Sequence, residues 1–283
     1  MRICPYCHAH GKFAFNVYAR SYDSCPGCDL IYQDQEATYE AVLAPYRKEY
    51  FSSCGMDQVG GSRENLYEHI LDTLEKRKGA GSLLDVGTGC GHFMRRAQQR
   101  GWQAKGIEPS TEAVFAATGK DVDIFTGTLR EYPGNETFDA VTFINVLDHS
   151  AAPWDEIRRA RERLKTDGMI FIRIPNGRLH CQLLRAASAC GLGKKIQRYL
   201  IFHQYSLTPR FVNNLLKDLG FFNIAIFNSK PSSGDPHGLF AAPFLAQWLK
   251  ILSYSAAKGV AHISQGKLFI GTSIDVIALK DKS

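Results

Sequence analysis

The first 28 residues contain two CxxC pairs, Cys4 with Cys7 and Cys25 with Cys28, separated by 17 residues. A tight turn in each pair can direct two sulfur atoms at one ion, and an intervening hairpin can bring the pairs together. Because so short a segment buries little apolar surface, it needs a bound metal ion to fold. A redox role is disfavoured, since no βαβ pattern follows either pair. We therefore predict a closed, structural Zn²⁺ site at these four cysteines.

A second chemical signal is a glycine-rich turn after an apolar run. The run contains Asp85 and passes into three alternating glycines, Gly87, Gly89 and Gly91. Glycines let the backbone approach a ligand closely. Glu108 follows 17 residues after Gly91, at the end of the next apolar run, where an acid can accept hydrogen bonds from both ribose hydroxyls. Asp85 would repel a diphosphate and attract an ammonium, so we expect a cofactor with a ribose and an amino-acid-like tail.

These motifs resemble those of the class I S-adenosylmethionine-dependent methyltransferases, over about residues 82–280. The resemblance implies a Rossmann-like sheet and S-adenosylmethionine as the cofactor. Residues 127–129 fall where the family contacts adenine, although Thr128 stands in place of the common acid. Residues 138–149, 164–170 and 271–276 resemble the fourth strand with its loop, the turn into the fifth strand and the last, antiparallel strand. The implied cofactor-binding residues are Asp85, Gly87, Thr88, Gly89, Gly91, Glu108, Thr128, Leu129 and Asn145.

The N-terminal segment narrows the resemblance. A CxxC…CxxC module followed by Tyr46, Tyr50 and Phe51 is similar to the subset of these methyltransferases that act on small molecules or glycoconjugates. Some ribosomal RNA methyltransferases also begin with a zinc module, but their fourth ligand is usually histidine, and here it is Cys28. We expect a small-molecule or glycoconjugate acceptor. RNA base methylation and a non-catalytic cofactor-binding module stay open as alternatives.

Two histidines are candidate catalytic residues. Methyl transfer is an in-line displacement in which the protein aligns the nucleophile, and an oxygen nucleophile usually needs a base. The resemblance places His149 after the fourth strand, near the methyl donor. It places His203 in the loop before a helix that often covers the acceptor. The alternative is that His149 caps a loop and His203 only packs.

Residues 168–217 contain no Asp or Glu. A surface that carries charges of only one sign concentrates ligands of the opposite charge. This basic span therefore predicts an anionic acceptor, or an acceptor that is lipid-linked at a membrane surface. The alternative is a solvated basic face of an inserted helix. Residues 239–260 form a candidate amphipathic helix, or helix pair, whose stripe Phe240, Phe244 and Trp248 suits either core packing or a hydrophobic contact. The basic residues of the span are Arg173, Arg178, Arg185, Lys194, Lys195, Arg198, Arg210 and Lys217.

Short apolar runs alternate with helical patterns from residue 82 onward, which predicts an α/β fold with helices on both faces of a seven-stranded sheet. We expect strands at 82–86, 103–107, 122–125, 138–144, 169–174, 222–228 and 268–279, and helices at 92–100, 110–118, 154–164 and 209–219. An earlier helix would begin at the N-cap candidate Ser62 and include Leu66 to Leu74. The predicted domains are a zinc ribbon (1–36), a helical linker or lid (37–80) and a methyltransferase domain (81–283) with a substrate-covering insertion at about 175–207.

The overall composition is that of a soluble globular protein. Of 283 residues, 45% are apolar and 22% charged, which excludes disordered and collagen-like chains. The formal net charge of +6, about +4 with a four-thiolate zinc site, is too small for a general nucleic-acid binder. No signal-like apolar segment begins the sequence, and the uncharged stretch at 239–249 is too short to span a bilayer. We expect a cytoplasmic protein; the sequence does not indicate its oligomeric state.

Overall fold

The structure is a computed structural model. It describes residues 2–18, 20–34, 40–41, 44, 63–117, 121–233 and 243–281, with only the backbone for 243–247. Several predictions therefore fall outside the described residues, namely those for Tyr46, Tyr50, Phe51, Ser62 and Phe240, and for the side chain of Phe244.

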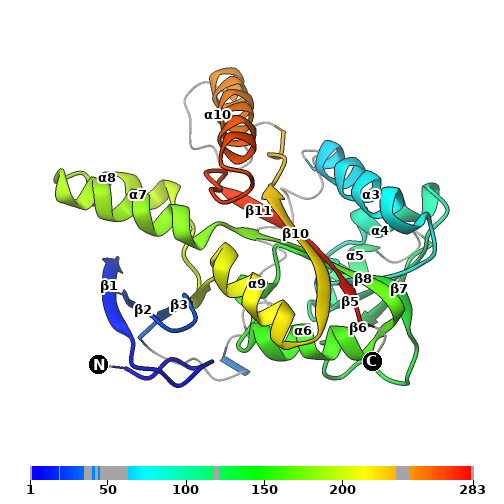
Figure 1. Cartoon of the computed structure of the whole chain (residues 1–283). Helices are drawn as coiled ribbons and strands as arrows, with labels where there is room; N and C mark the ends of the chain where they lie inside the picture. Colours follow the sequence, from blue (N-terminus) through cyan, green and yellow to red (C-terminus); the bar gives the residue numbers. More distant parts are fainter. Residues whose placement is uncertain are drawn as a thin grey trace.

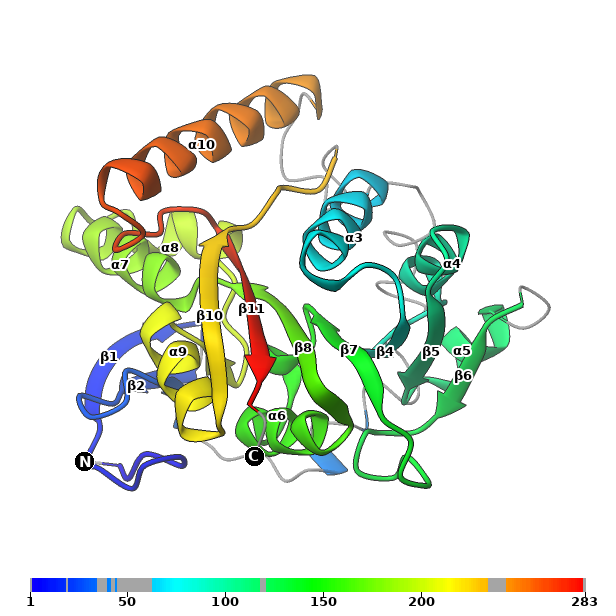
Figure 2. The same cartoon turned by 45° about the vertical axis from the view of Figure 1, so that its right-hand side comes forward.

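A seven-stranded sheet with the order β10-β11-β8-β7-β4-β5-β6 forms the centre of the molecule (Figures 1 and 2). Strands β6, β5, β4, β7 and β8 are mutually parallel, and β11 runs antiparallel to both β8 and β10. This confirms the predicted α/β class, the seven strands and the antiparallel last strand. The strands are β4 (Ser82–Val86), β5 (Gln103–Glu108), β6 (Asp123–Thr126), β7 (Phe138–Ile144), β8 (Leu164–Pro175), β10 (Phe221–Asn228) and β11 (Ser273–Lys280).

Helices cover both faces of the sheet. Alternate residues of β8 enter two separate hydrophobic cores, with Ile170 and Ile172 on one face and Met169 and Phe171 on the other, as the period of two along a strand requires. The first core includes residues of α6 (Pro153–Glu162) and α9 (Pro209–Asp218), and the second includes residues of α3 (Glu64–Lys78) and α4 (His92–Gln99). The other helices are α5 (Thr111–Ala117), α7 (Gly177–Ala189), α8 (Gly193–Ile196) and α10 (Pro243–Ile263), with 3-10 turns η1 (Leu147–His149) and η2 (Gln197–Tyr199).

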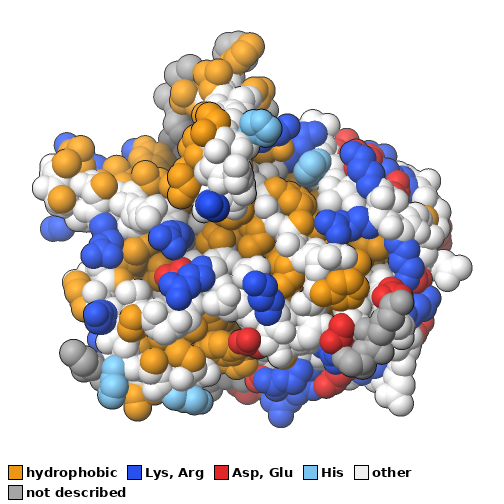
Figure 3. All heavy atoms as spheres, in the orientation of Figure 1, with side chains coloured by type: hydrophobic (Ala, Val, Ile, Leu, Met, Phe, Trp, Pro, Cys, Tyr) orange, Lys and Arg blue, Asp and Glu red, His pale blue; other side chains and the backbone are white. Residues whose placement is uncertain are grey.

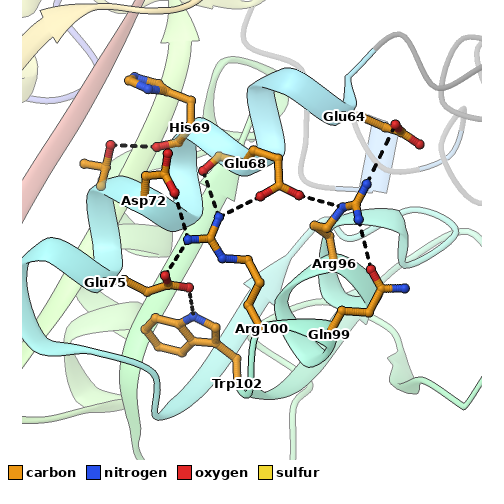
Figure 4. A network of polar contacts seen from close by, with 10 residues as sticks. Glu64, Glu68, His69, Asp72, Glu75, Arg96, Gln99, Arg100 and Trp102 are labelled. Carbon is orange, nitrogen blue, oxygen red and sulfur yellow. Dashed lines mark hydrogen bonds and ion pairs between the residues drawn. The ribbon is translucent and has the colours of Figure 1, made fainter.

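Helix α3 is fixed to the sheet by packing and by charge. Its side chains Leu66, Ile70, Leu71 and Leu74 are buried. Figure 4 shows that Arg100, just after α4, reaches three acids of α3. Its guanidinium lies 2.7 Å from the carboxylates of Glu68 and Asp72 and also contacts Glu75. Arg96 lies 2.8 Å from Glu68, and the Trp102 indole donates to Glu75 at 3.1 Å. This helix is therefore held firmly in the layer that covers one face of the large sheet.

The N-terminal segment forms a second sheet with a strand from far along the chain. Strands β1 (Lys12–Val17), β2 (Arg20–Ser24) and β3 (Ile31–Gln33) form an antiparallel meander, and β3 pairs with β9 (Tyr205–Ser206). Helix α7 packs on β1 (Figure 1), where Cys181 and Leu184 share a core with Phe15 and Tyr22. The insertion at about 175–207 is thus joined to the N-terminal segment. The domain boundaries at residues 36 and 80 stay predictions.

Several element boundaries differ from those expected. Strand β8 begins at Leu164 instead of 169, because Leu164 already aligns with Phe138 of β7. Strand β11 begins at Ser273 instead of 268, because the Asn176 side chain donates to the carbonyls of Phe269 and Gly271 and holds that stretch as a loop. Residues 243–263 form one helix, α10, which Asn228 anchors through a 2.8 Å hydrogen bond to the carbonyl of Ala257. Trp248 of the predicted stripe is half exposed.

Candidate functional site

The four N-terminal cysteines converge. The Sγ atoms of Cys4 and Cys28 lie 3.6 Å apart, those of Cys7 and Cys25 lie 3.3 Å apart, and all four fall within 4.8 Å of one another. A tetrahedral ion with Zn–S bonds of about 2.3 Å places its sulfurs about 3.8 Å apart. The four thiols therefore fit one zinc ion with no position left for a substrate.

Both cysteine pairs have the same backbone turn, which explains the convergence. The Cys4 amide donates to the carbonyl of Ala9 at 2.8 Å, and the Cys25 amide donates to that of Leu30 at 2.8 Å. His8 and Asp29, each four residues after the first cysteine of its pair, have positive φ angles of 59° and 69°. The CxxC spacing thus produces two equivalent knuckles.

The cysteine cluster is packed against the large domain. Tyr6, inside the first knuckle, contacts Trp154 of α6 at 5.6 Å and Phe211 of α9 at 5.2 Å between ring centroids. Its hydroxyl donates to Asp218 at 3.2 Å. Leu30 and Tyr32 belong to the main hydrophobic core. The position of this segment is therefore coupled to the sheet that carries the glycine-rich turn.

The glycine-rich turn lies at the carboxyl end of β4. Gly87, Gly89 and Gly91 all have positive φ angles, 74°, 56° and 70°, a region that side chains with a Cβ rarely adopt. A Cβ on Gly87 would also lie 2.5 Å from Cγ2 of Val146, in the loop after β7. The glycines are thus required for the turn itself and for its close approach to the neighbouring loop.

Asp85 and Glu108 flank the turn from adjacent strands. Asp85 is buried and accepts a 2.6 Å hydrogen bond from Thr142. Burial raises the pKa of the Asp85 carboxyl to about 7. Glu108 accepts hydrogen bonds from the Gly89 amide at 2.8 Å and the Ser110 amide at 2.9 Å, one on each oxygen. Because each oxygen has a second lone pair, this carboxylate can still receive two ribose hydroxyls.

The loop after β6 reaches the same edge of the sheet. The Gly127 amide donates to the Glu108 carbonyl at 2.9 Å. Both the amide and the hydroxyl of Thr128 donate to Glu131, at 2.8 and 2.9 Å, while Leu129 is buried. Glu131 is therefore an acid in direct contact with Thr128, which stands where the resemblance leads us to expect an acid. Glu131 is not among the residues predicted from the sequence, although the i, i+3 spacing of the two residues is visible there.

Asn145 lies in the loop after β7, with a positive φ of 57°. Its side-chain oxygen accepts a 2.6 Å hydrogen bond from Arg173, at the end of β8. Arg173 also donates to Ser229 at 2.8 Å and lies 3.8 Å from the buried carboxylate of Asp275.

The predicted basic span is mostly exposed. Arg173 is its buried member, while Lys194, Lys195 and Arg198 are exposed on α8 and η2. Figure 3, in the orientation of Figure 1, shows blue Lys and Arg side chains among hydrophobic ones on the side of the molecule where α7 and α8 lie.

His149 and His203, which are 54 residues apart in the chain, come together. Their ring centroids lie 3.8 Å apart, and both imidazoles face the buried Asp148. The Asp148 Oδ2 atom is 3.7 Å from Nε2 of His149 and 3.4 Å from Nε2 of His203. Burial lowers the pKa of His149 to about 4, and burial together with His149 lowers that of His203 to about 4. Both rings are therefore neutral near pH 7 and can accept a proton or a cation.

Two different segments position this cluster. His149 ends η1, where its amide donates to the Val146 carbonyl at 3.0 Å. His203 precedes β9, which is held by β3 and by a 3.1 Å hydrogen bond from the Tyr205 hydroxyl to the Ala151 carbonyl. Asp148 is not among the residues predicted from the sequence. The sequence shows that it directly precedes His149, but it does not show that its side chain is buried.

A comparison with protein families agrees with this geometry. A family model described as a methyltransferase domain matches residues 60–226, more than half of the chain. The chain belongs to the S-adenosylmethionine-dependent class I methyltransferases. The family predicted from the sequence is thus confirmed. The matched region of this methyltransferase contains the glycine-rich turn, Glu108 and both candidate histidines.

Curated relatives match part of the methyltransferase. A tRNA U34 carboxymethyltransferase of Shewanella sediminis (strain HAW-EB3) is 31% identical over 141 residues, 46% of this chain and 42% of that protein. A ubiquinone biosynthesis O-methyltransferase of Actinobacillus pleuropneumoniae serotype 7 (strain AP76) is 28% identical over 114 residues, 36% of this chain and 49% of that protein. The chain spans less than half the length of each of these relatives.

Solved structures share the fold. An S-adenosylmethionine-dependent methyltransferase from Archaeoglobus fulgidus has a TM-score of 0.53 at 16% identity, covering 82% of this chain and 100% of that one. The plantazolicin methyltransferase BpumL, solved in complex with SAH, has a TM-score of 0.55 at 16% identity, covering 86% and 95%. Within the described residues of this methyltransferase, no helix is long and apolar enough to cross a bilayer.

Proposed function

We propose that this methyltransferase transfers the methyl group of S-adenosylmethionine to an oxygen atom of an anionic small molecule or glycoconjugate. The observation that carries the proposal is the grouping of Asp148, His149 and His203 beside the glycine-rich turn. A Cβ on Gly87 would lie 2.5 Å from Cγ2 of Val146, which is two residues before Asp148. A group that can take a proton from the acceptor therefore lies next to the expected place of the methyl donor.

The cofactor site consists of loops at the carboxyl ends of four neighbouring strands, where parallel α/β sheets bind their ligands. Asp85 would pair with the ammonium of the cofactor, and Gly87, Thr88, Gly89 and Gly91 would provide a close backbone surface. Glu108 would accept the ribose hydroxyls. Thr128, Leu129 and Asn145 would lie toward the adenine and the methyl group. When bound, the cofactor supplies an electrophilic methyl on a sulfonium, and the chain's own residues orient the acceptor and remove its proton.

The charge around the cluster supports an anionic acceptor. The exposed bases of α8 and η2, Lys194, Lys195 and Arg198, precede His203 in the chain. No acid stands among them between residues 168 and 217. A phosphorylated or lipid-linked glycoconjugate at a membrane surface has the charge that such a basic surface attracts.

We propose a stabilising role for the zinc ribbon, residues 1–36, and a cytoplasmic location for the protein. Residues 37–80 would lead into the methyltransferase domain, residues 81–283. The ribbon would contribute to the reaction indirectly, because its strand β3 holds β9, which follows His203.

A transfer assay tests the proposal. Purified protein is incubated with methyl-labelled S-adenosylmethionine and a panel of phosphorylated glycans and lipids, and the product is analysed for O-methyl groups. We expect label on an acceptor oxygen, and a loss of at least about 100-fold in His203→Ala. His262→Ala, which alters an exposed histidine of α10, is the matched control. No transfer to any acceptor, with cofactor bound, would instead support the non-catalytic binding module.

RNA base methylation is the second candidate, favoured by the similarity to a tRNA-modifying relative and by the basic span. Phosphate contacts would make binding fall steeply with salt, with a slope of about 0.7 to 0.9 per contacted phosphate on logarithmic axes. Binding of a small acceptor would show a shallow slope.

A further inference from the structure

We propose that Asp148, His149 and His203 form a binding site for a divalent transition-metal ion, separate from the cysteine cluster. The three side chains each offer one ligand atom, and these atoms all lie within 4.8 Å of one another. The inference deepens, and rests on, the proposed methyl transfer to oxygen, because it assigns the means by which the cluster acts on the acceptor.

The distances distinguish a metal site from a hydrogen-bonded pair. A charge-assisted hydrogen bond between imidazole and carboxylate would have a separation of about 2.7–2.9 Å. The two Nε2–Oδ2 separations are longer, at 3.4 and 3.7 Å. Ligands at about 2.0–2.1 Å from a tetrahedral ion are about 3.3–3.4 Å apart. The side chains are therefore spaced as ligands around an ion.

The state of Asp148 is an independent observation. Its side chain is 4% exposed, and neither carboxylate oxygen accepts a hydrogen bond from another described residue. A buried ionised carboxylate is very costly unless it is paired or coordinates a metal. A cation between Asp148 and the two imidazoles would remove this cost, which packing alone does not.

The neighbouring positive charge is balanced. Arg173 is the buried base near Asp148, and it is engaged by Asn145, Ser229 and the buried carboxylate of Asp275. The Arg173 guanidinium therefore makes its hydrogen bonds and its ion pair with other residues and does not serve as the counter-ion of Asp148. The His149 and His203 side chains are 21% and 34% exposed, so the third side of the cluster is accessible to a ligand from solution.

The donor set indicates the class of ion. Two imidazoles with one carboxylate suit Zn²⁺, Fe²⁺ and similar first-row ions, whereas Ca²⁺ and Mg²⁺ prefer oxygen ligands alone. Three protein ligands also leave positions open, as in catalytic metal sites. An acceptor hydroxyl at an open position would be more acidic. With the ion bound, the imidazoles would serve as ligands, so the hydroxyl proton would pass to water instead of to a histidine. The O–CH₃ bond would form as the S–CH₃ bond breaks, and the electron pair of the S–CH₃ bond would remain on sulfur in S-adenosylhomocysteine.

Zinc stoichiometry tests the site without any assay of activity. The purified protein is incubated with excess Zn²⁺, passed through gel filtration, and its zinc measured by elemental analysis. We expect two zinc ions per chain in the wild type and in His262→Ala, and one in Asp148→Asn and His203→Ala. Circular dichroism and the affinity for S-adenosylmethionine should match those of the wild type in all three variants, which excludes unfolding as the cause.

The proposal would be overturned by a wild type that retains a single zinc ion, or by Asp148→Asn and His203→Ala variants that retain two. A methyl transfer rate unaffected by removing the second ion would overturn its assigned role. Two ions without methyl transfer to any acceptor would leave the metal site standing and reject the proposed function. One ion with normal transfer would reject the metal site and leave the function standing.

Discussion

At the residue scale, the proposed role of Asp85 connects cofactor binding to pH. Burial raises the pKa of its carboxyl to about 7, so the free protein holds a neutral Asp85 below that pH. In the proposed site the cofactor ammonium pairs with the Asp85 carboxylate, so binding below pH 7 would release a proton. The affinity for S-adenosylmethionine should fall toward acid, with a limiting loss of about tenfold per pH unit below 7. Calorimetric titration at pH 6, 7 and 8 measures this slope.

Matched variants show whether Asp85 is the titrating group. Asp85→Asn should bind more weakly at pH 8 and lose the slope. Asp155→Asn, which alters a partly exposed acid of α6, should keep both affinity and slope. A slope that persists in Asp85→Asn would assign the pH dependence to another group.

The residues that sequence reasoning found and missed differ in how they are recognised. The glycines and Glu108 are visible because a backbone turn and a strand end recur at fixed spacings. Glu131 and Asp148 are ordinary acids in the sequence. They become notable only through long-range burial and contacts, with Asp148 facing His203 from a segment 55 residues away.

At the element scale, the zinc ribbon should control the position of His203 through β3 and β9. A Cys7→Ala/Cys25→Ala double variant would release the ribbon strands. We expect methyl transfer to fall about 100-fold, since a displacement of about 1 Å in a reacting group has that effect. The affinity for S-adenosylmethionine, measured by calorimetry, should stay unchanged, because the proposed cofactor residues lie on other loops.

Cys190→Ala is the control, because it alters an exposed cysteine at the end of α7. It should leave transfer and cofactor binding at the wild-type level. Normal transfer in the double variant would show that β9 holds His203 without the ribbon, contrary to the coupling described here.

The ion-pair network of Arg100 should contribute to stability at the level of helix α3. Arg100 is 24% exposed, so solvent screens each of its three pairs to about 0.2–1 kcal/mol. Arg100→Met should lower the free energy of unfolding by about 1–2 kcal/mol in urea, and by less in high salt. Arg158→Met, which removes one exposed pair within α6, should cost less than about 0.5 kcal/mol. Equal losses in the two variants would argue against the network.

The strands of the large sheet could be predicted because buried parallel strands form continuous apolar runs. The pairing of β3 with β9 could not. A strand of two residues has no periodicity, and its partner lies more than 170 residues away. The start of β11 was misplaced for a similar reason, because the hydrogen bonds of Asn176 that hold residues 269–271 as a loop are long-range.

At the scale of the whole molecule, the positively charged side formed by α8 and η2 should attract the acceptor. Reversal of Lys194, Lys195 and Arg198 to Glu should raise KM for an anionic acceptor about tenfold or more at low salt, and leave kcat unchanged. The effect should shrink as salt screens the charges. Steady-state kinetics at two ionic strengths measure both constants.

The control reverses Lys76 and Arg77, exposed bases in the last turn of α3, and should leave KM unchanged. An unchanged KM in the α8 and η2 variant would show that these bases form a solvated face without a role in recognition. Equal increases in both variants would indicate a general effect of net charge.

The central claim is that the glycine-rich turn and Glu108 hold S-adenosylmethionine. Calorimetric titration of the zinc-loaded protein tests it most directly. The account predicts one binding site in the wild type and in Glu112→Ala, an exposed acid on α5. Glu108→Ala should weaken binding by about 100-fold, through the loss of two charge-assisted hydrogen bonds. Absence of binding in the wild type, or equal affinity in Glu108→Ala, would contradict the account.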